Sequence, residues 1–224
     1  MATRSGACGS EVGERGVSEA EKVAKRLAKL YPDAHCALDY SNAFELLVAT
    51  VLSAQTTDER VNTITPTLFS KCPTPEALAE TSPDELSEIV KPLGFHRRRG
   101  KQLQALGEQL ETSFRGQVPS RREDLEQLPG VGRKTAHVVL GNAFGKRAIT
   151  VDTHVGRLAR RLGWSRETKP LAVEKDIAAL LPDEDWTLLC HRLIEHGRKV
   201  CHSKRPQCGS CQLAELCPSA GTLT

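Results

Sequence analysis

The sequence predicts an all-α protein. Apolar residues recur at helical spacing along most of the chain, and several of these stretches begin with the Ser or Thr that is typical of a helix N-terminus. The alternating apolar and polar pattern of β-strands between hairpin turns is absent. The chain of 224 residues is long enough for one large domain or two small ones, each with a hydrophobic core.

The helices are predicted in order from their start signals. The first begins at Ser18, which forms a capping box with Glu21 ahead of an apolar face. The next, residues 43–53, is apolar nearly all round, which indicates a helix buried at the centre. The remaining predicted helices span residues 58–70, 95–114, 133–143, 153–162, 170–180 and 184–199, with short ones opening at Thr74-Pro75, at Ser82-Pro83 and at a capping box of Ser120 with Glu123.

Charge restricts the class of partner. Lys and Arg exceed Asp and Glu by 31 − 28 = 3, so the overall charge argues only weakly for an anionic partner. Basic residues cluster locally, however, and a series of clusters interleaved with Gly turns indicates a surface that follows phosphates, although each cluster alone is typical of a solvated helix face. The clusters are residues 96–101, Arg121-Arg122, Arg133-Lys134, Arg157 with Arg160-Arg161, and Lys204-Arg205.

Neither a membrane span nor an export signal is predicted. Residues 1–17 are small, polar and charged, so we expect a flexible N-terminal arm rather than a signal peptide. No run approaches the ~18 to 20 apolar residues of a membrane-spanning helix. Four of the eight cysteines are scattered along the chain, as in proteins of a reducing compartment. We therefore expect a cytoplasmic protein.

A glycine turn joins two predicted helices at residues 128–136, Leu-Pro-Gly-Val-Gly-Arg-Lys-Thr-Ala. A Gly-x-Gly turn that opens a helix exposes backbone N–H groups, and the helix N-terminus carries partial positive charge, so the turn suits a phosphate. Lys134 lies in the first turn of the second helix. It either holds that phosphate or acts as a nucleophile, because the field of the helix end helps to keep its amine neutral.

Four cysteines crowd the C-terminus. Cys201, Cys208, Cys211 and Cys217 are separated by six, two and five residues, so their thiolates can surround one metal centre within a short loop. Tetrahedral zinc and an iron–sulfur cluster both use four sulfur ligands, and the spacing alone does not separate them. In either case we expect a structural centre rather than a redox centre.

Asp152 has a structural and a functional interpretation. It stands where an apolar run meets a predicted helix, and an isolated Asp there would be an N-cap, favoured by roughly four to one. The functional alternative is a carboxylate that works with Lys134 as an acid–base pair.

Gln55 and Phe95 have the same ambiguity. Gln55 ends the buried helix in a run of small polar residues, where Thr57 or Asp58 caps the next helix, and its amide is also suited to fill the gap left by an extruded base. Phe95 follows Gly94 beside the basic residues 96–101 and is either an ordinary core residue or an apolar wedge that separates bases.

Together these stretches resemble the endonuclease III family of DNA glycosylase/AP lyases. The resemblance covers residues 20 to 218, and the ordered set of motifs is far more specific than any one of them. Its pieces are residues 44–49, 52–58, 128–136, 151–154, the tripeptide His196-Gly197-Arg198 and the four-cysteine loop.

The resemblance implies an all-α, two-domain helix-hairpin-helix glycosylase fold with the DNA cleft between the domains. A helical barrel domain would span residues 36–146 and hold the hairpin at about 119–143. An iron–sulfur cluster domain would combine residues 18–35 with 147–224, and the arm would be residues 1–17. The family pattern also implies a [4Fe–4S] cluster on the four cysteines, Cys201, Cys208, Cys211 and Cys217.

The resemblance also implies an activity: removal of oxidised pyrimidines from duplex DNA, followed by cleavage of the abasic strand through a lysine Schiff base. Lys134 matches the family's catalytic lysine and Asp152 its catalytic aspartate. The expected partner is double-stranded DNA with oxidised pyrimidines or abasic sites, bound by a monomer in the bacterial cytoplasm, associated with the nucleoid. The implied DNA contacts are Gln55, Phe95, Gly130, Val131, Gly132, Arg133 and His154.

Two alternatives stay open. Mismatch-specific monofunctional glycosylases share the scaffold but have Tyr or Ser at the position of Lys134, and a non-catalytic helix-hairpin-helix protein would need neither Lys134 nor Asp152.

The chain departs from the family pattern at His137, where many relatives have Asn, and at His96, where Tyr is frequent. The triple arginine, residues 97–99, is also heavier than usual, which puts the grip on phosphates in question.

Overall fold

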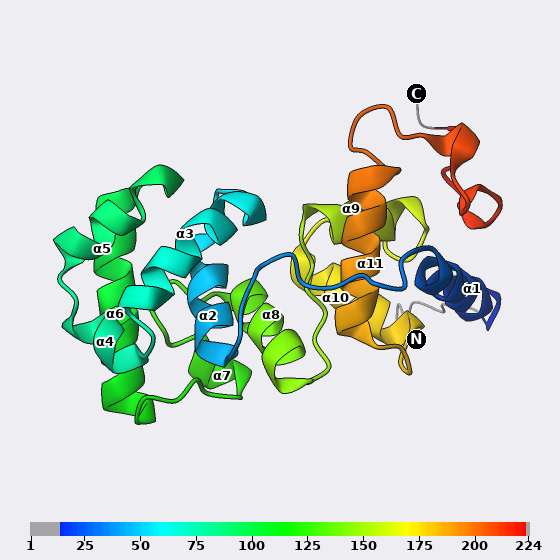
Figure 1. The fold of residues 1–224 in the computed structure, drawn as a ribbon. Helices are drawn as coiled ribbons and strands as arrows, with labels where there is room; N and C mark the ends of the chain where they lie inside the picture. Colours follow the sequence, from blue (N-terminus) through cyan, green and yellow to red (C-terminus); the bar gives the residue numbers. More distant parts are fainter. Residues whose placement is uncertain (1–13, 223–224) are drawn as a thin grey trace, which may run out of the picture. The chain divides into compact units, whose positions relative to one another are not determined.

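The computed structural model describes residues 14–222, and within them every regular element is helical, which confirms the predicted all-α class. Figure 1 shows the order of the helices along the chain. No helix of the described residues is long and apolar enough to cross a membrane. The α-helices are α1 (Glu14–Leu30), α2 (Ala43–Leu52), α3 (Asp58–Lys71), α4 (Pro75–Glu80), α5 (Pro83–Ile89), α6 (His96–Phe114), α7 (Arg122–Leu125), α8 (Arg133–Phe144), α9 (Thr153–Arg161), α10 (Pro170–Leu180) and α11 (Trp186–Lys199).

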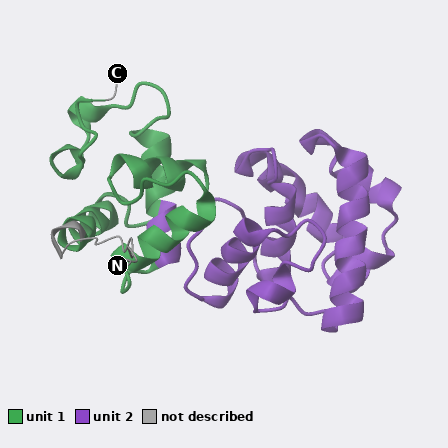
Figure 2. Cartoon of the chain, turned by 180° about the vertical axis from the view of Figure 1, so that it is seen from behind, with its two compact units in different colours: residues 1–34, 151–185, 192–224 green, residues 35–150, 186–191 purple. Residues whose placement is uncertain are grey.

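The chain divides into two compact units, which Figure 2 shows in different colours. Unit 1 comprises residues 1–34, 151–185 and 192–224, and unit 2 comprises residues 35–150 and 186–191. Within unit 1 the structure describes residues 14–34, 151–185 and 192–222. The first residues of α11 therefore group with unit 2. His191 explains part of this grouping, because its Nε2 lies 2.8 Å from Oδ1 of Asn142 in α8.

Helix α2 lies in the core of unit 2, as the apolar run predicted. Eight of its ten residues are buried, and the helix packs against α3 and α8. Its start is fixed by two reciprocal bonds: Glu45 N donates to Asn42 Oδ1 at 2.9 Å, and Glu45 Oε2 accepts from Ser41 N at 2.6 Å. The long helix α6 packs along α4 and α5 and adds a row of buried leucines to the same core.

Unit 1 has its own core. Helix α1 contributes a buried stripe of Ala20, Val23, Ala24 and Leu27, in agreement with the predicted amphipathic pattern. Buried residues of α9, α10 and α11 supply the other side, and the loop after α11 contains two short 3₁₀ turns, η2 (Cys208–Ser210) and η3 (Ala214–Leu216).

The predicted helix starts were only partly right. Thr74 and Ser82 are N-caps as predicted, accepting from Ala77 N at 3.2 Å and Glu85 N at 3.3 Å. The capping box at Ser18 is wrong, because α1 already begins at Glu14; residues 1–13 of the predicted arm lie outside the described residues. The capping box at Ser120 is also wrong.

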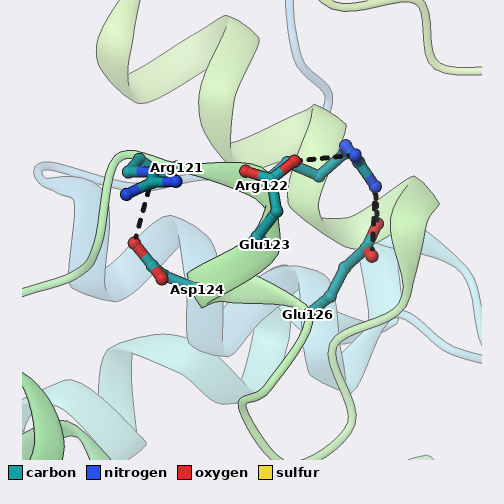
Figure 3. Close-up of polar contacts among 5 residues, drawn as sticks. All are labelled: Arg121, Arg122, Glu123, Asp124 and Glu126. Atoms are coloured by element: carbon teal, nitrogen blue, oxygen red, sulfur yellow. Dashed lines mark hydrogen bonds and ion pairs between the residues drawn. The ribbon is translucent and has the colours of Figure 1, made fainter.

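Helix α7 begins instead at Arg122, after an N-cap residue, Arg121, that makes no side-chain cap bond. Arg122 donates to Glu123 at 2.7 Å and to Glu126 at 3.1 Å, and Arg121 lies 3.9 Å from Asp124, as Figure 3 shows. Glu123 thus binds an arginine side chain rather than the backbone of Ser120. The basic pair of residues 121–122 is matched by these carboxylates, which weakens its predicted role in following phosphates.

Candidate active site and cluster loop

The hairpin of unit 2 consists of α7, a turn and α8. Gly130 adopts φ +82°, in the left-handed region, and a Cβ there would lie 1.8 Å from Gln102 Nε2, so the turn requires glycine. Gly132 is the N-cap of α8; it has no side chain to cap the helix, and a Cβ on it would meet nothing within 4 Å. The first turn of α8 thus starts from an open position on the protein surface, as a phosphate-binding turn requires.

Lys134 is exposed in this first turn, and Arg133 beside it is partly exposed. The first turn of α8 contains no acidic residue. Val131, which was predicted to contact DNA, is 6% exposed and belongs to the core of unit 2. The structure therefore presents a cationic helix end with an accessible amine.

His137, one turn after Lys134, packs internally. It is 7% exposed, and its Nδ1 lies 2.9 Å from the carbonyl oxygen of Ile149. This contact joins α8 to the segment that leads toward Asp152. Because His137 is buried, this departure from the family pattern lies in the packing of α8 rather than on its surface.

Asp152 is the N-cap of α9, in unit 1. Its Oδ1 accepts from Val155 N at 2.7 Å, while the residue is partly exposed. Only one of its two carboxylate oxygens is used in this bond. The structural interpretation of Asp152 as an N-cap is thus confirmed.

His154 lies in the first turn of α9, against α11. Arg157 Nη2 lies 3.0 Å from His154 Nδ1, and because a guanidinium only donates, the imidazole accepts there in its neutral form. Burial lowers the pKa of His154, Arg157 and Arg198 lower it further, and Asp152 and the Gly197 carbonyl oppose the shift.

Gly197, the centre of the His-Gly-Arg tripeptide, lies where a side chain would clash with α9. A Cβ on it would lie 2.8 Å from His154 Nδ1 and 2.9 Å from Arg157 Nη2. Glycine therefore lets α9 approach α11 closely enough for Arg157 to donate to the carbonyls of Gly197 and Cys201, each at 3.0 Å. The helix that starts at Asp152 is in this way fixed to the start of the cysteine loop.

Four cysteines line one hollow in unit 1. Cys201 Sγ accepts from Arg161 Nη1 at 3.1 Å, and Cys211 Sγ lies 3.5 Å from His196 Nε2 and 3.4 Å from Leu213 N. All four are free thiols, and as placed no three His, Cys, Asp or Glu side chains of the described part form a metal-binding group. The N–H donors aimed at sulfur are what an anionic thiolate centre needs, so the residues fit either centre that the sequence indicated. The cysteines are Cys201, Cys208, Cys211 and Cys217.

His196 is the other fixed point of this loop. It is 3% exposed, and burial lowers its pKa to about 4, so the ring is neutral near pH 7. Tyr31 Oη lies 2.9 Å from Nδ1 and Cys211 Sγ lies 3.5 Å from Nε2, so each ring nitrogen has a hydrogen-bond partner. Burial also raises the pKa values of the Cys211 and Cys217 thiols.

Gln55 and Phe95 both lie exposed on loops of unit 2. Phe95 is 67% exposed, which rules out the core interpretation. Both have left-handed backbones, with φ +62° at Gln55 and φ +49° at Phe95. Such a backbone costs a non-glycine residue about 1–2 kcal/mol, and strained residues of this kind concentrate at functional sites.

The triple arginine divides into two kinds of residue. Arg97 and Arg98 are exposed, whereas Arg99 is 6% exposed and donates to three backbone carbonyls. Arg157 and Arg161 likewise donate to carbonyls of the cysteine loop. Sequence clustering could not separate solvated arginines from structural ones, because their partners lie about 40 to 47 residues away along the chain.

Comparison with known proteins defines the class first. The family model of the HhH-GPD superfamily, base excision DNA repair proteins, matches residues 48–183, a range that contains the hairpin, Lys134 and Asp152. An all-helical fold with this hairpin therefore belongs to a base excision repair protein of the helix-hairpin-helix class.

Individual relatives narrow the class. Endonuclease III of Synechocystis is 51% identical over 195 residues, 87% of this chain and 89% of its own, and that of Bacillus subtilis is 45% identical over 86% and 88%. The chain belongs to the endonuclease III family. A solved endonuclease III–DNA covalent intermediate, trapped with an estranged adenine, matches with a TM-score of 0.86 and 42% identity over 92% of this chain and 97% of that one. A thermostable thymine-DNA glycosylase, at 22% identity and a TM-score of 0.84, shares the fold.

Proposed function

We propose that the chain is a bifunctional DNA glycosylase and AP lyase that removes oxidised pyrimidines from duplex DNA. The observation that carries the proposal is the exposed Lys134 in the first turn of α8, directly after the glycine turn, in a member of the endonuclease III family. A DNA-binding hairpin alone needs no such amine. A lysine there allows both base removal and strand cleavage, whereas a carboxylate with water would stop at base removal.

The first step joins Lys134 to the sugar. A damaged base is flipped out of the duplex, which costs least where pairing or stacking is already impaired. Nζ of Lys134 attacks through its lone pair and forms a bond to C1′ as the bond from C1′ to the base breaks. The base leaves with the electron pair of that bond and takes up the proton that Nζ loses. Asp152 stabilises the positive charge that develops on the sugar through the carboxylate oxygen that does not cap α9.

The second step cuts the strand. Ring opening gives a Schiff base between Lys134 and C1′, which makes the C2′ hydrogen acidic. A base removes that proton, the electron pair of the C2′–H bond forms a C2′=C3′ double bond, and the C3′–O3′ bond breaks. Its electron pair leaves with the oxygen, so the 3′ fragment of the strand departs with a 5′-phosphate. Water then hydrolyses the Schiff base and frees the lysine. The open end of α8 at Gly132 would hold the backbone phosphate beside the lesion through its N–H groups.

The other predicted residues take supporting roles in this proposal. Gln55 fills the gap left by the extruded base, Phe95 enters the base stack, and Arg133 and His154 contact the DNA backbone. The enzyme acts as a monomer on the chromosome in a bacterial cytoplasm. Residues 36–146 would form the barrel domain, and residues 18–35 with 147–224 the cluster domain.

We also propose that the four cysteines hold a [4Fe–4S] cluster. When bound, such a cluster supplies a rigid structural centre for the C-terminal loop. Arg161, which donates to Cys201 Sγ, and His196, whose Nε2 lies 3.5 Å from Cys211 Sγ, would both be hydrogen-bond partners of the cluster's sulfur ligands. Metal analysis of the purified protein should find iron and inorganic sulfide; zinc in their place would refute the cluster.

Three duplexes test the function. They carry a thymine glycol, an abasic site or an A·G mismatch, and base loss and strand scission are scored separately for each. We expect base loss and scission with thymine glycol, scission at the abasic site and neither with the mismatch. Base loss from the mismatch alone, without scission, would favour the monofunctional alternative, and binding without either product would favour a non-catalytic protein.

A further inference from the structure

Arg99 is the one basic residue of the cluster at residues 96–101 that is buried, and its side chain donates to backbone carbonyls of two loops. Its Nη1 donates to Leu52 O at 2.8 Å and its Nη2 to Ala54 O at 2.7 Å, both at the end of α2. Its Nε donates to Gly94 O at 2.9 Å, at the start of α6. One guanidinium therefore joins the loop of Gln55 to the loop of Phe95.

The first of these bonds completes a helix end. Helix α2 ends at Leu52, and its last carbonyls have no partner within the helix, while its last turn contains no basic residue of its own. Arg99 supplies the missing donor and the missing positive charge from a different helix. Leu52 itself is 1% exposed, so its carbonyl is shielded from water and accepts from Arg99 instead.

The other two bonds act on the strained residues directly. Ala54 and Gly94 are the residues immediately before Gln55 and Phe95, so each accepting carbonyl belongs to the peptide unit that enters a left-handed residue. Fixing the carbonyl fixes the plane of that peptide, and hence the direction in which the next side chain leaves the loop. Both side chains leave it toward solvent.

From this geometry we propose that Arg99 is a positioning residue that holds Gln55 and Phe95 as one unit for lesion recognition. The inference rests on the proposed DNA contacts of these two residues. This positioning role distinguishes Arg99 from its neighbours Arg97 and Arg98, whose exposed side chains contribute only positive charge to the surface. It also explains the residue type, because a lysine has one nitrogen and cannot span carbonyls of residues 52, 54 and 94 together.

The test is a double-mutant cycle. Variants Arg99→Met, Gln55→Ala with Phe95→Ala, and all three changes together are compared with the unchanged protein. Anisotropy gives the Kd for a duplex with a tetrahydrofuran abasic analogue and for the same duplex undamaged, and the ratio of the two measures lesion discrimination. Arg98→Met is the matched control, because it removes the same charge from an exposed position.

We expect Arg99→Met to lower the discrimination ratio about ten-fold, as loss of a base-stacking contact does. Arg98→Met should weaken binding to both duplexes equally and leave the ratio unchanged. The triple variant should fall no further than Gln55→Ala with Phe95→Ala, because residues that act as a unit are not additive. Arg99→Lys, which keeps the charge and one bond, should recover part of the ratio.

The outcomes that overturn the proposal are distinct. A normal ratio in Arg99→Met, or an effect that adds fully in the triple variant, would show that Arg99 does not act through Gln55 and Phe95. A normal ratio in the Gln55→Ala, Phe95→Ala variant would refute the proposed DNA contacts themselves. If Arg99→Met fails to fold, Arg99→Lys carries the test, and a melting temperature lowered with an unchanged ratio would leave Arg99 a purely structural residue.

Discussion

At the scale of single residues, Asp152 is a helix cap in the structure and a catalytic carboxylate in our proposal. As the N-cap of α9 it accepts from Val155 N through one oxygen, Oδ1. The local pattern around residue 152 could predict the cap but not whether the carboxylate has a further function. The proposed function depends on Lys134, which belongs to the other unit and stands 152 − 134 = 18 residues earlier in the chain.

Asp152→Asn separates the two roles. Asn and Asp are equivalent N-caps, so we expect the free energy of unfolding to change by about 0.5 kcal/mol or less. Loss of the negative charge should lower single-turnover base removal by about 10²-fold or more. Asp152→Ala is the comparison, since it should lose the cap as well, at a cost of about 1 kcal/mol. An Asn variant with normal base removal would show that Asp152 is a cap and nothing more.

At the scale of elements, the hairpin assigns different tasks to its two glycines. Gly130 has a left-handed backbone and faces Gln102, whereas Gly132 has an ordinary backbone and faces open space. The sequence showed a Gly-x-Gly turn but could not show this difference, which depends on where α6 places Gln102.

Gly130→Ala should destabilise the protein and Gly132→Ala should not. The left-handed backbone costs alanine about 1–2 kcal/mol, so thermal unfolding of Gly130→Ala should occur several degrees lower. Gly132→Ala should unfold near the normal temperature but bind undamaged duplex more weakly, because its methyl group occupies the surface where a phosphate approaches. Equal losses of stability in the two variants would contradict these assignments.

Capping signals illustrate the limit of local patterns at the same scale. Ser18 with Glu21 and Ser120 with Glu123 match the capping box, yet the first pair lies inside α1 and the second Glu binds Arg122. Thr74 and Ser82, each followed by a proline at the first helical position, are true caps. The proline makes the difference, since its fixed φ and missing N–H select a helix start over a helix interior.

At the scale of the whole molecule, the all-α class and the family were predicted from the order of the motifs. Helical periodicity predicted the all-α class, and the ordered set of motifs from residues 44–49 to the four cysteines predicted the family. What the sequence could not provide were long-range contacts such as Arg99 with Leu52 or Arg161 with Cys201. An arginine in a basic cluster looks the same whether its partner is water, a phosphate or a distant carbonyl.

The central claim is that Lys134 forms a covalent bond to the sugar, and borohydride trapping on an abasic duplex tests it most directly. Reduction of the Schiff base should give a stable protein–DNA adduct with the unchanged protein and with Lys175→Gln, an exposed lysine of α10 that serves as control. Lys134→Gln should give no adduct while it still binds the abasic duplex. An adduct formed by Lys134→Gln in normal yield would contradict the assignment of the nucleophile.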